Sequence, residues 1–506
     1  MDESKKYINI LKILSLDMID ACKNGYPGIS LGASSIIYTL FTKELNIMPS
    51  VPDWLNRDRL VLSAAHAAGL VYANMYMAGY DLTLEDLKDF GKLNSKSPLL
   101  CNMLKTKGID FTTGPAGYGF SGAVGMAMGE KYYQSLLSKY VKNQKLVNHY
   151  IYCLVSDGDI ESGLLMEAAS LAGLYNLGNL IVLYDSNGMT MDNSLDKSST
   201  DDVLKKFSSL GWQTDYVSEG SSVDKINKAI KRAKRVLNKP SFIEIKTVIG
   251  KDSFNQNTNI VHDHALTKDD LENIKRKYGF STEKFNVDEK VLEKYRKDIN
   301  KRVSKSYQLW SEYHKAMAKY PNEEIKKLVA FADNKDISYS LNGDAFKIQN
   351  SYQEEMTESN NKIMNIIADK TPYFLGGASD MASSCRVNLN KEAYFTTKNY
   401  LGRNISFGVR EGAMSGILSG MATYGFRTFG ATYLRYAYSE LEGIKMSGLM
   451  GLPVTYIFTH DGFNESRNGE VQSSFEVLNI LRSIPGVTVY RPSDINEIIG
   501  SWSSIL

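Results

Sequence analysis

The stretch Val155-Ser156-Asp157-Gly158-Asp159 closes an apolar run that begins at Ile151, and Tyr184-Asp185-Ser186-Asn187-Gly188-Met189 closes a second run that begins at Leu180. Short apolar runs of this kind predict buried parallel strands. The segment between them, Gly163 to Leu177, is rich in small residues and predicts a helix. Strand, helix and strand in this order form a βαβ unit, so this part of the chain is expected to be an α/β layer structure.

Polar side chains at the ends of these two strands predict a metal site. Asp157 and Asn187 would lie at the carboxyl ends of neighbouring parallel strands, where open α/β sheets bind ligands. Mg²⁺ takes about six oxygen ligands, and the protein usually supplies few of them. Asp157, Asn187 and a backbone carbonyl would leave positions for a diphosphate, which Gly158 and the following helix amino terminus could approach closely. The alternative is a pair of turn residues that cap helices, since Asp-Gly is common in turns.

The rest of the chain continues the alternation of strands and helices on both sides of a polar segment. The opening helix has apolar residues from Ile10 to Ile19, and a basic amphipathic helix is expected over Lys225 to Lys239, with Leu237 on its packed face. We therefore predict an α/β protein of two domains, each with a mostly parallel sheet and helices on both faces. The domains would cover residues 1–320 and 351–506, joined by a linker over 321–350. The further strands are expected at Leu60 to Leu62, Phe242 to Ile249, Tyr373 to Leu375, Thr428 to Tyr433, Val454 to Thr459 and Val487 to Tyr490.

Composition excludes several classes of protein. The chain has 506 residues, enough for about three domains, and 59 basic against 57 acidic residues leave a net charge of +2. The overall charge therefore does not favour nucleic acid or anionic lipid as a partner. Four scattered cysteines without a CxxC motif argue against a disulfide scaffold or a zinc site and favour a reducing compartment. No apolar run approaches the ~18 residues of a membrane span, so we expect a soluble, cytoplasmic protein.

The two strand-end motifs resemble the thiamine diphosphate motif of the transketolase family, and the resemblance extends over nearly the whole chain. The other segments similar to family motifs are Asn24 to Gly32, Arg57 to His66, Thr112 to Gly119, Val261-His262, Gly376 to Asp380, Gly408 to Met414, Thr459-His460-Asp461 and Tyr490 to Asp494. The resemblance implies two thiamine diphosphate-binding domains, one for the diphosphate and one for the pyrimidine. It also implies transfer of a two-carbon ketol unit from a ketose to an aldose, through a covalent cofactor adduct, in the pentose phosphate pathway of carbohydrate metabolism.

The resemblance also implies the ligands and the site residues. The cofactors would be thiamine diphosphate and Mg²⁺ (or Ca²⁺), and the enzyme would be a homodimer with cofactor sites between subunits. The metal ligands would be Asp157, Asn187 and Met189. The catalytic residues would be Glu411, His262, His460 and His66. The cofactor-binding residues would be His66, Gly114, Pro115, Ala116, Asp157, Gly158, Glu167, Asn187, His262, Asp380, Glu411, Tyr433 and Tyr436. The substrate-binding residues would be Tyr26, Ser384, His460, Asn468 and Gln472.

The chemistry of thiamine diphosphate explains these residue types. The cofactor deprotonates its own thiazolium carbon through its aminopyrimidine, provided that a carboxylate hydrogen-bonds the pyrimidine ring nitrogen. Glu411 matches the family's residue for this role, although a salt bridge with Arg410 is the alternative. Tyr433 and Tyr436 match positions where the family stacks aromatic rings, but they could equally be core residues. Imidazoles suit the proton transfers of ketol transfer.

The sequence departs from the family mainly at the substrate end. Tyr26 and Leu100 stand where the family has histidines, and Ser162 stands where it has a glutamate beside the present Glu161. Glu358 falls near a phosphate-binding arginine, where a carboxylate would repel a sugar phosphate. The sequence ends at Leu506, before the third, carboxy-terminal domain of the family, so we expect either that this domain is absent or that the chain is a fragment. An enzyme with different, unphosphorylated substrates and a non-catalytic paralogue therefore stay open as alternatives.

Overall fold

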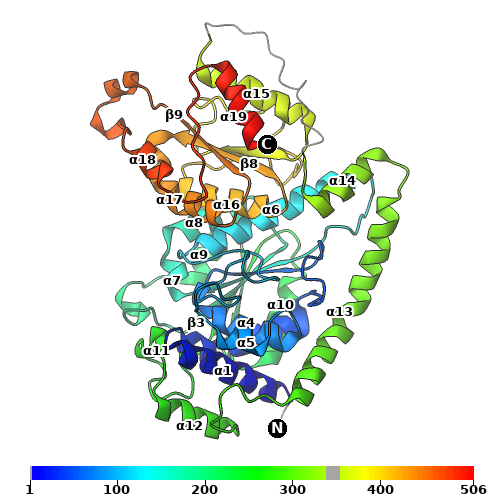
Figure 1. Cartoon of the computed structure of the whole chain (residues 1–506), viewed down its shortest axis with the longest axis vertical. Coiled ribbons are helices and arrows are strands. Elements are labelled where there is room, and N and C mark those ends of the chain that lie inside the picture. Colours follow the sequence, from blue (N-terminus) through cyan, green and yellow to red (C-terminus); the bar gives the residue numbers. More distant parts are fainter. Residues whose placement is uncertain (1–2, 338–353) are drawn as a thin grey trace. The chain divides into compact units, whose positions relative to one another are not determined.

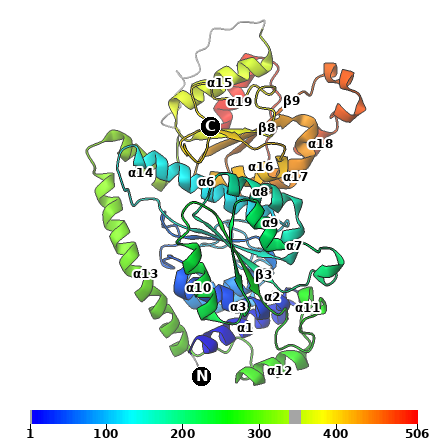
Figure 2. The ribbon, with the colours of Figure 1, turned by 180° about the vertical axis from the view of Figure 1, so that it is seen from behind.

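The computed structural model describes residues 3–337 and 354–506. The chain divides into two compact units, which are described separately. Unit 1 consists of Met1–Ala123 and Asn148–Tyr313, and unit 2 of Val124–Val147 and His314–Leu506. Helices lie on both faces of the sheet in each unit, as Figures 1 and 2 show from opposite sides.

Unit 1 is built on a five-stranded parallel sheet with the order β1-β2-β3-β5-β4. Ser156 pairs with Asp185 in the register of β2 and β3, so the two strands end at the same level. This register places Asp157 and Asn187 at one edge of the sheet, as expected for parallel neighbours. The strands are β1 Arg59–Leu62, β2 Ile151–Ser156, β3 Leu180–Ser186, β4 Gln213–Val217 and β5 Ser241–Lys246.

The helices of unit 1 bury long apolar faces. The α-helices that begin in this unit are α1 Glu3–Cys22, α2 Pro27–Gly32, α3 Ser34–Thr39, α4 Ala68–Ala78, α5 Leu84–Lys88, α6 Tyr118–Ser138, α7 Asp157–Glu161, α8 Gly163–Leu174, α9 Val203–Ser209, α10 Val223–Ala233, α11 Ile260–Asp263, α12 Lys268–Tyr278 and α13 Glu289–Ala318. Shorter helical turns are η1 Leu40–Glu44, η2 Ala65–Ala67 and η3 Leu195–Lys197. Two of the three unit boundaries fall inside α6 and α13, and the third lies between Val147 and Asn148.

Two lysines lie inside the interface between α1 and α12. Lys275 forms a buried ion pair with Asp17 at 2.6 Å, and the Asp17 carboxylate also accepts a hydrogen bond from the Phe285 N–H. Lys12 is buried too, and its Nζ donates to the Tyr278 hydroxyl at 3.1 Å. Burial lowers the pKa of Lys12 to about 8. The packing of α1 on α12 therefore depends on charged groups as well as apolar ones.

Unit 2 contains a four-stranded parallel sheet with the order β7-β6-β8-β9. Its strands are β6 Phe374–Ala378, β7 Asn404–Ser406, β8 Arg427–Tyr433 and β9 Val454–Thr459. The helices are α14 Glu323–Asn334, α15 Met356–Lys370, α16 Glu411–Ala422, α17 Leu441–Leu449, α18 Val477–Arg482 and α19 Ile495–Ile505, with the shorter turns η6 Leu434–Glu440, η7 Phe463–Asn468 and η8 Glu470–Gln472. Close packing of α6 on α16 is possible because position 125 is a glycine, whose added Cβ would overlap the carbonyl oxygen of Ile417.

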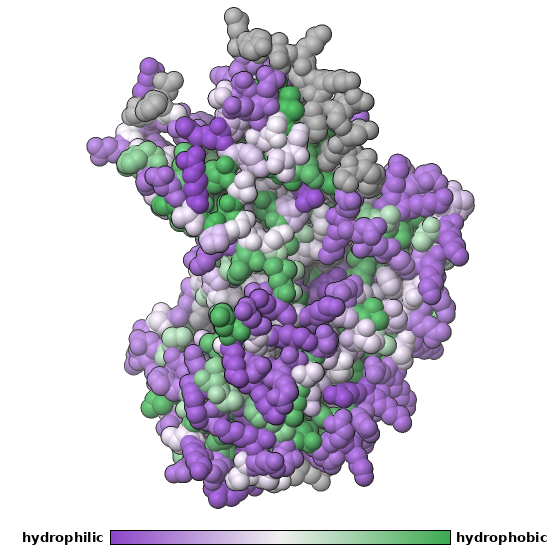
Figure 3. Space-filling model, viewed as in Figure 1, coloured by the Kyte–Doolittle hydropathy of each residue, from purple (hydrophilic) through white to green (hydrophobic). Residues whose placement is uncertain are grey.

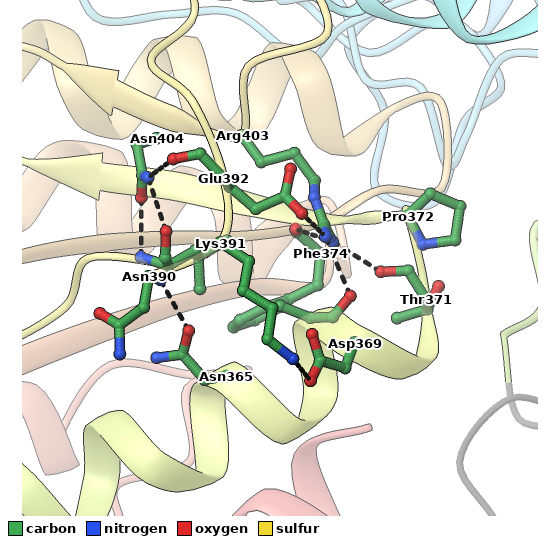
Figure 4. Close-up of polar contacts among 12 residues, drawn as sticks. Asn365, Asp369, Thr371, Pro372, Phe374, Asn390, Lys391, Glu392, Arg403 and Asn404 are labelled. Atoms are coloured by element: carbon green, nitrogen blue, oxygen red, sulfur yellow. Dashed lines mark hydrogen bonds and ion pairs between the residues drawn. The ribbon is translucent and has the colours of Figure 1, made fainter. Parts of the chain in front are cut away.

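A polar network holds the short strand β7 to the rest of unit 2 (Figure 4). Buried Arg403 donates to the Thr371 carbonyl at 2.8 Å and pairs with Glu392 at 2.6 Å. The Asn404 side chain accepts from the Leu389 N–H and donates to the Glu392 carbonyl. Because a three-residue strand offers few ladder hydrogen bonds, these side chains supply much of its attachment.

The expected linker over 321–350 contains a helix. The α14 side chains of Ile325, Leu328, Val329 and Phe331 are buried, and the Phe331 ring stacks on Tyr373 with centroids 3.5 Å apart. Both residues belong to unit 2. Residues 338–350 of the expected linker lie outside the described residues.

Several expected elements differ in the structure. The chain leaves the sheet after Lys246 rather than Ile249, and α8 ends at Leu174 rather than at Leu177. The helix expected to reach Lys239 ends at Ala233, so Leu237 is 69% exposed instead of packed. Val487 to Tyr490 is not a strand, whereas β4 and β7 were not expected. Both lie at sheet edges, where a strand does not need a continuous apolar run.

No helix among residues 3–337 and 354–506 is long and apolar enough to cross a membrane. Hydrophilic residues cover most of the face drawn in Figure 3, with hydrophobic residues between them.

Candidate active site

Asp157 and Asn187 meet at the carboxyl ends of β2 and β3. Asp157 Oδ2 accepts hydrogen bonds from the backbone N–H groups of Asn187 and Gly188, both at 3.1 Å. Its Oδ1 accepts from the Tyr184 hydroxyl at 2.5 Å. Burial raises the pKa of the Asp157 carboxyl, and these three hydrogen bonds oppose the rise. The carboxylate is thus held rigidly beside the turn that follows β3.

The oxygen atoms gathered here fit a hard cation such as Mg²⁺. Asn187 Oδ1 lies in the same turn, where it accepts from the Met189 N–H at 3.0 Å. Added Cβ atoms at Gly158 and Gly188 would meet nothing within 4 Å, so there is space beside the two ligands. The described residues contain no cluster of three or more His, Cys, Asp or Glu side chains for a metal. A site with one carboxylate, one amide and one carbonyl leaves room for diphosphate oxygens.

Asp159 connects the loop Thr112 to Gly119 to the sheet. The sequence did not reveal this role. Its Oδ1 accepts from the Ser63 hydroxyl at 2.7 Å and from the Gly117 N–H at 2.9 Å. Its Oδ2 accepts from the Ser156 N–H, which forms a capping box at the start of α7. The Ser-x-x-Asp spacing from Ser156 to Asp159 was the available signal. The contacts with Ser63 and Gly117 depend on the tertiary fold.

The loop Gly114-Pro115-Ala116 lies close to two of the positions that depart from the resembled family. Ser162 donates to the Ala116 carbonyl at 3.1 Å. An added Cβ at Gly114 would lie 3.6 Å from Leu100 Cδ1. Leu100 and Ser162 are therefore neighbours of this loop. Leu100 places an apolar side chain beside it, and Ser162 places a hydroxyl group. Glu167 lies half-buried on α8.

Tyr26, His66 and His262 form an aromatic cluster in unit 1. The His66 and His262 rings stack with centroids 5.1 Å apart, and the Tyr26 ring meets His66 edge-on at 5.5 Å. Burial and the nearby His262 lower the pKa of His66 to about 3, and burial also lowers the pKa of His262. Both imidazoles are therefore neutral near pH 7. His262 Nδ1 is buried without a hydrogen-bond partner among the described residues, so it is available to a ligand.

Glu411 begins α16 in unit 2 and is 8% exposed. Its Oε1 accepts a hydrogen bond from the Ser379 hydroxyl at 2.9 Å. Arg410, the alternative partner of Glu411, donates to the Phe407 carbonyl at 2.9 Å. Asp380 follows β6 in a left-handed conformation with φ of 60° and is exposed.

Aromatic and polar residues of unit 2 come together around Tyr433. The Tyr433 ring stacks on His460 at 3.8 Å and on Tyr436 at 6.1 Å between centroids. Its hydroxyl lies 2.5 Å from Ser384 Oγ, and Gln472 donates to the Tyr436 hydroxyl at 3.4 Å. Four of these five residues are partly buried, so they form a surface site rather than part of the core. Both tyrosines therefore remain accessible to a ligand.

Two expected substrate-site positions have other partners. The Asn468 amide donates to Glu465, three residues earlier, and Asn468 is exposed. The Glu358 carboxylate pairs with Arg386 at 3.1 Å, and Arg386 also pairs with Glu355 at 2.7 Å. The Arg386 guanidinium therefore compensates the charge of Glu358 only in part, because it is shared with Glu355.

The chain matches two family descriptions that together cover almost its whole length. "Transketolase, thiamine diphosphate binding domain" matches residues 3–336, and "Transketolase, pyrimidine binding domain" matches residues 353–506. The chain is 36% identical over 502 residues to the transketolase of Bacillus subtilis, covering 98% of this chain and 75% of that protein. It is 38% identical over 506 residues to the transketolase of Aquifex aeolicus, covering 99% of this chain and 72% of that protein. The solved transketolase of Leishmania mexicana has a TM-score of 0.94 at 31% identity, covering 100% of this chain and 75% of that one.

Proposed function

The chain belongs to the transketolase family, and on this premise we propose that the residues described above hold thiamine diphosphate and a divalent metal and act on the sugars of its reaction. The family assignment makes the protein a transferase that moves a two-carbon ketol unit from a ketose to an aldose. When bound, thiamine diphosphate supplies a thiazolium carbon that can carry this unit. The expected identification as a transketolase-like enzyme is thus confirmed, and the residue roles stay our proposal.

The observation that carries the proposal is the meeting of Asp157 and Asn187 at one edge of the sheet. We assign Asp157, Asn187 and the Met189 carbonyl to the metal, because they offer hard oxygen ligands with space beside them. The diphosphate would lie against Gly158 and the loop Gly114-Pro115-Ala116, with Glu167 on the adjacent helix α8. Asp159 would hold that loop in place through Gly117.

In unit 2 we assign Glu411 to the pyrimidine ring nitrogen. Its burial and its hydrogen bond from Ser379 support a carboxyl group held in one orientation. Tyr433 and Tyr436 would stack on the pyrimidine ring, and Asp380 would border the cofactor. The role of Glu411 is to hold or move a proton at the ring nitrogen.

Three histidines are proposed to act on the sugar hydroxyls. His66 and His262 are supported by their lowered pKa values, because a neutral imidazole can both accept and donate a proton. His460 stacks on Tyr433 and shares a hydrogen bond with the Thr459 hydroxyl at 2.8 Å. Tyr26, Ser384, Asn468 and Gln472 would complete the substrate site.

The substrates are a ketose and an aldose, and we propose that both are phosphorylated. A transketolase of Pichia stipitis is described in complex with sedoheptulose-7-phosphate and, as a variant, with fructose-6-phosphate. The pairing of Glu358 with Arg386 weakens the repulsion expected from an isolated carboxylate, although Arg386 also pairs with Glu355 and the three side chains together keep one negative charge. The histidine replacements at Tyr26 and Leu100 favour unphosphorylated sugars as the second candidate.

We further propose a cytoplasmic homodimer. Residues 1–320 would supply the metal and diphosphate half of each site and residues 351–506 the pyrimidine half, with the two halves coming from different copies of the chain. The assignment of the two family descriptions to these regions supports the division. Four cysteines without a disulfide support a reducing compartment.

Ketol transfer between purified sugars tests the proposal. Fructose 6-phosphate and a five-carbon aldose phosphate should yield a four-carbon aldose phosphate and a seven-carbon ketose phosphate. Product should form only when thiamine diphosphate and Mg²⁺ are both present. Transfer from unphosphorylated fructose at an equal or higher rate would favour the second candidate. Cofactor binding without transfer from either donor would overturn both assignments of substrate.

A further inference from the structure

A chain of two hydrogen bonds runs from a buried thiol to the ring of His460. Cys385 Sγ lies 3.2 Å from Thr459 Oγ1, and Thr459 Oγ1 lies 2.8 Å from His460 Nδ1. Cys385 is fully buried and Thr459 is 9% exposed, whereas His460, which follows β9, is only partly buried. All three residues belong to unit 2. The chain therefore connects the core of this unit to an imidazole that solvent can reach.

The backbone and a ring contact also fix His460. Its φ of 58° lies in the left-handed region, which is disfavoured for a residue with a Cβ atom and persists only where the surrounding structure enforces it. The imidazole stacks on the Tyr433 ring with centroids 3.8 Å apart, and the next residue, Asp461, pairs with Arg491 at 3.0 Å. A half-turn of the imidazole would keep this stacking but would place a carbon beside the Thr459 hydroxyl. The hydrogen bond at Nδ1 therefore selects one of the two ring orientations and leaves Nε2 for a ligand.

The direction of the two hydrogen bonds follows from the groups that make them. The Thr459 hydroxyl has one proton, so it donates to one of its two neighbours and accepts from the other. An unprotonated imidazole nitrogen is a good acceptor, whereas a thiol sulfur is a weak one. Burial raises the pKa of the Cys385 thiol, so this group keeps its proton and can donate it. The favoured order is therefore donation from Cys385 to Thr459 and from Thr459 to His460 Nδ1.

We infer that Thr459 is a positioning residue for His460, with the Cys385 thiol behind it, and that together they keep the proton of the neutral imidazole on Nε2. The hydrogen bond made by one ring nitrogen decides whether the other nitrogen carries the proton. Because Nδ1 accepts from Thr459, the neutral ring has an N–H group at Nε2. This group can donate a hydrogen bond to a sugar oxygen that gains negative charge during ketol transfer. The inference rests on the proposed role of His460 at the sugar.

Nitrogen NMR of the full chain without cofactor or sugar tests the position of this proton independently of activity. In protein labelled with ¹⁵N-histidine at pH 8, the His460 ring should have a protonated Nε2 and an unprotonated Nδ1. The resonances of this ring are identified by their absence in His460→Gln. Thr459→Val removes the hydroxyl group but keeps the branched shape, so it should shift the Nδ1 resonance. A proton on Nδ1 in wild type, or the same Nδ1 resonance in Thr459→Val, would overturn the inference.

The matched control for this variant is Thr455→Val. Thr455 lies on the same strand, β9, and is half-buried. The control makes the same chemical change four residues before Thr459, so it should leave the Nδ1 resonance of His460 unchanged. An equal shift in both variants would overturn the inference, because it would show a general response to changes in β9.

Ketol transfer with a conservative variant separates positioning from packing. Thr459→Val should lower kcat/KM for the sugar donor by about tenfold or more, whereas Thr459→Ser, which keeps the hydroxyl group, should stay within about threefold of wild type. Exchange of the thiazolium proton of bound thiamine diphosphate should be normal in both, because His460 is assigned to the sugar. Equal losses of kcat/KM in both variants, or no loss in either, would overturn the inference. Normal transfer in His460→Gln would instead overturn the proposed role of His460 itself.

Cys385 variants test the buried end of the chain and keep the test valid if Thr459→Val folds poorly. Cys385→Ala removes the donor to Thr459, so the Nδ1 resonance of His460 should shift and kcat/KM should fall by about threefold or more. Cys385→Ser keeps a donor and should restore much of the loss. Cys22→Ala, which removes a half-buried thiol of unit 1, should behave like wild type. An unchanged Nδ1 resonance in Cys385→Ala would overturn the role of the thiol.

Discussion

Among single residues, Asp157 offers the most direct access to the metal site. Asp157→Ala removes a charged ligand and leaves the diphosphate charge poorly compensated, so affinity for thiamine diphosphate at fixed Mg²⁺ should fall more than tenfold, or more than about 1.4 kcal/mol. Titration calorimetry measures the change. Asp192→Ala, an exposed aspartate in the loop after β3, should bind like wild type. If Asp157→Ala bound thiamine diphosphate as tightly as wild type, the metal assignment would be wrong and Asp157 would be only a turn residue.

The sequence predicted residues whose signal is local and missed those whose partners are distant. Asp157 and Asn187 were predicted because each ends its own apolar strand, and the register of the two strands brings them together. The contacts of Asp159 with Ser63 and Gly117 join segments far apart in the chain.

At the level of helices, the α6–α16 contact depends on a glycine. Gly125→Ala would push a methyl group into the Ile417 carbonyl, and overpacking of this kind costs about 1–3 kcal/mol of unfolding free energy. Denaturant unfolding measures the loss. Gly500→Ala is the matched control, because its added Cβ meets nothing within 4 Å on α19. It should be neutral or stabilise by up to about 1 kcal/mol. Similar stabilities for the two variants would contradict this packing.

The α1–α12 contact should give the stability a pH dependence. Because the pKa of Lys12 is about 8 in the folded protein and 10.5 ordinarily, the unfolded chain binds more protons between these values. The contribution of Lys12 to the free energy of unfolding therefore rises with pH through this window, by ~3 kcal/mol in all. Lys12→Met should exceed wild type in stability at pH 7.5, and the gap should close towards pH 10. The control is Lys6→Met, which changes an exposed lysine on the same helix. A difference in unfolding free energy between Lys12→Met and wild type that stays constant with pH would contradict a buried, charged Lys12.

The sequence predicted the strands whose two faces are both buried, and it missed strands at the edges of the sheets. β2 and β3 are buried along their whole length, which gives the continuous apolar run that sequence patterns detect. β4 contains Asp215 and is partly exposed, and β7 has three residues attached through Arg403 and Asn404. Val487 to Tyr490 has the composition of a strand but no strand partner in the described part of unit 2.

For the whole molecule, the proposed homodimer predicts that two inactive variants restore each other. A mixture of Asp157→Ala and Glu411→Ala subunits would form heterodimers with one site carrying both changes and one site carrying neither. After random reassortment about a quarter of all sites should be intact, so about a quarter of the wild-type transfer activity should return. Each variant alone is the control. No recovery in a mixture that sedimentation shows to be dimeric would mean that each chain builds its own site.

The central claim is that this chain binds thiamine diphosphate and activates it through Glu411. Exchange of the cofactor's thiazolium proton with solvent, followed by NMR in the presence of Mg²⁺, measures this without any assumption about the sugars. Wild type should accelerate the exchange strongly, whereas Glu411→Ala should bind the cofactor and exchange ~10²–10⁴-fold more slowly. Glu442→Ala, which changes an exposed glutamate of the same unit, should behave like wild type. Unchanged exchange in Glu411→Ala, or no acceleration by wild type with the cofactor bound, would contradict the account.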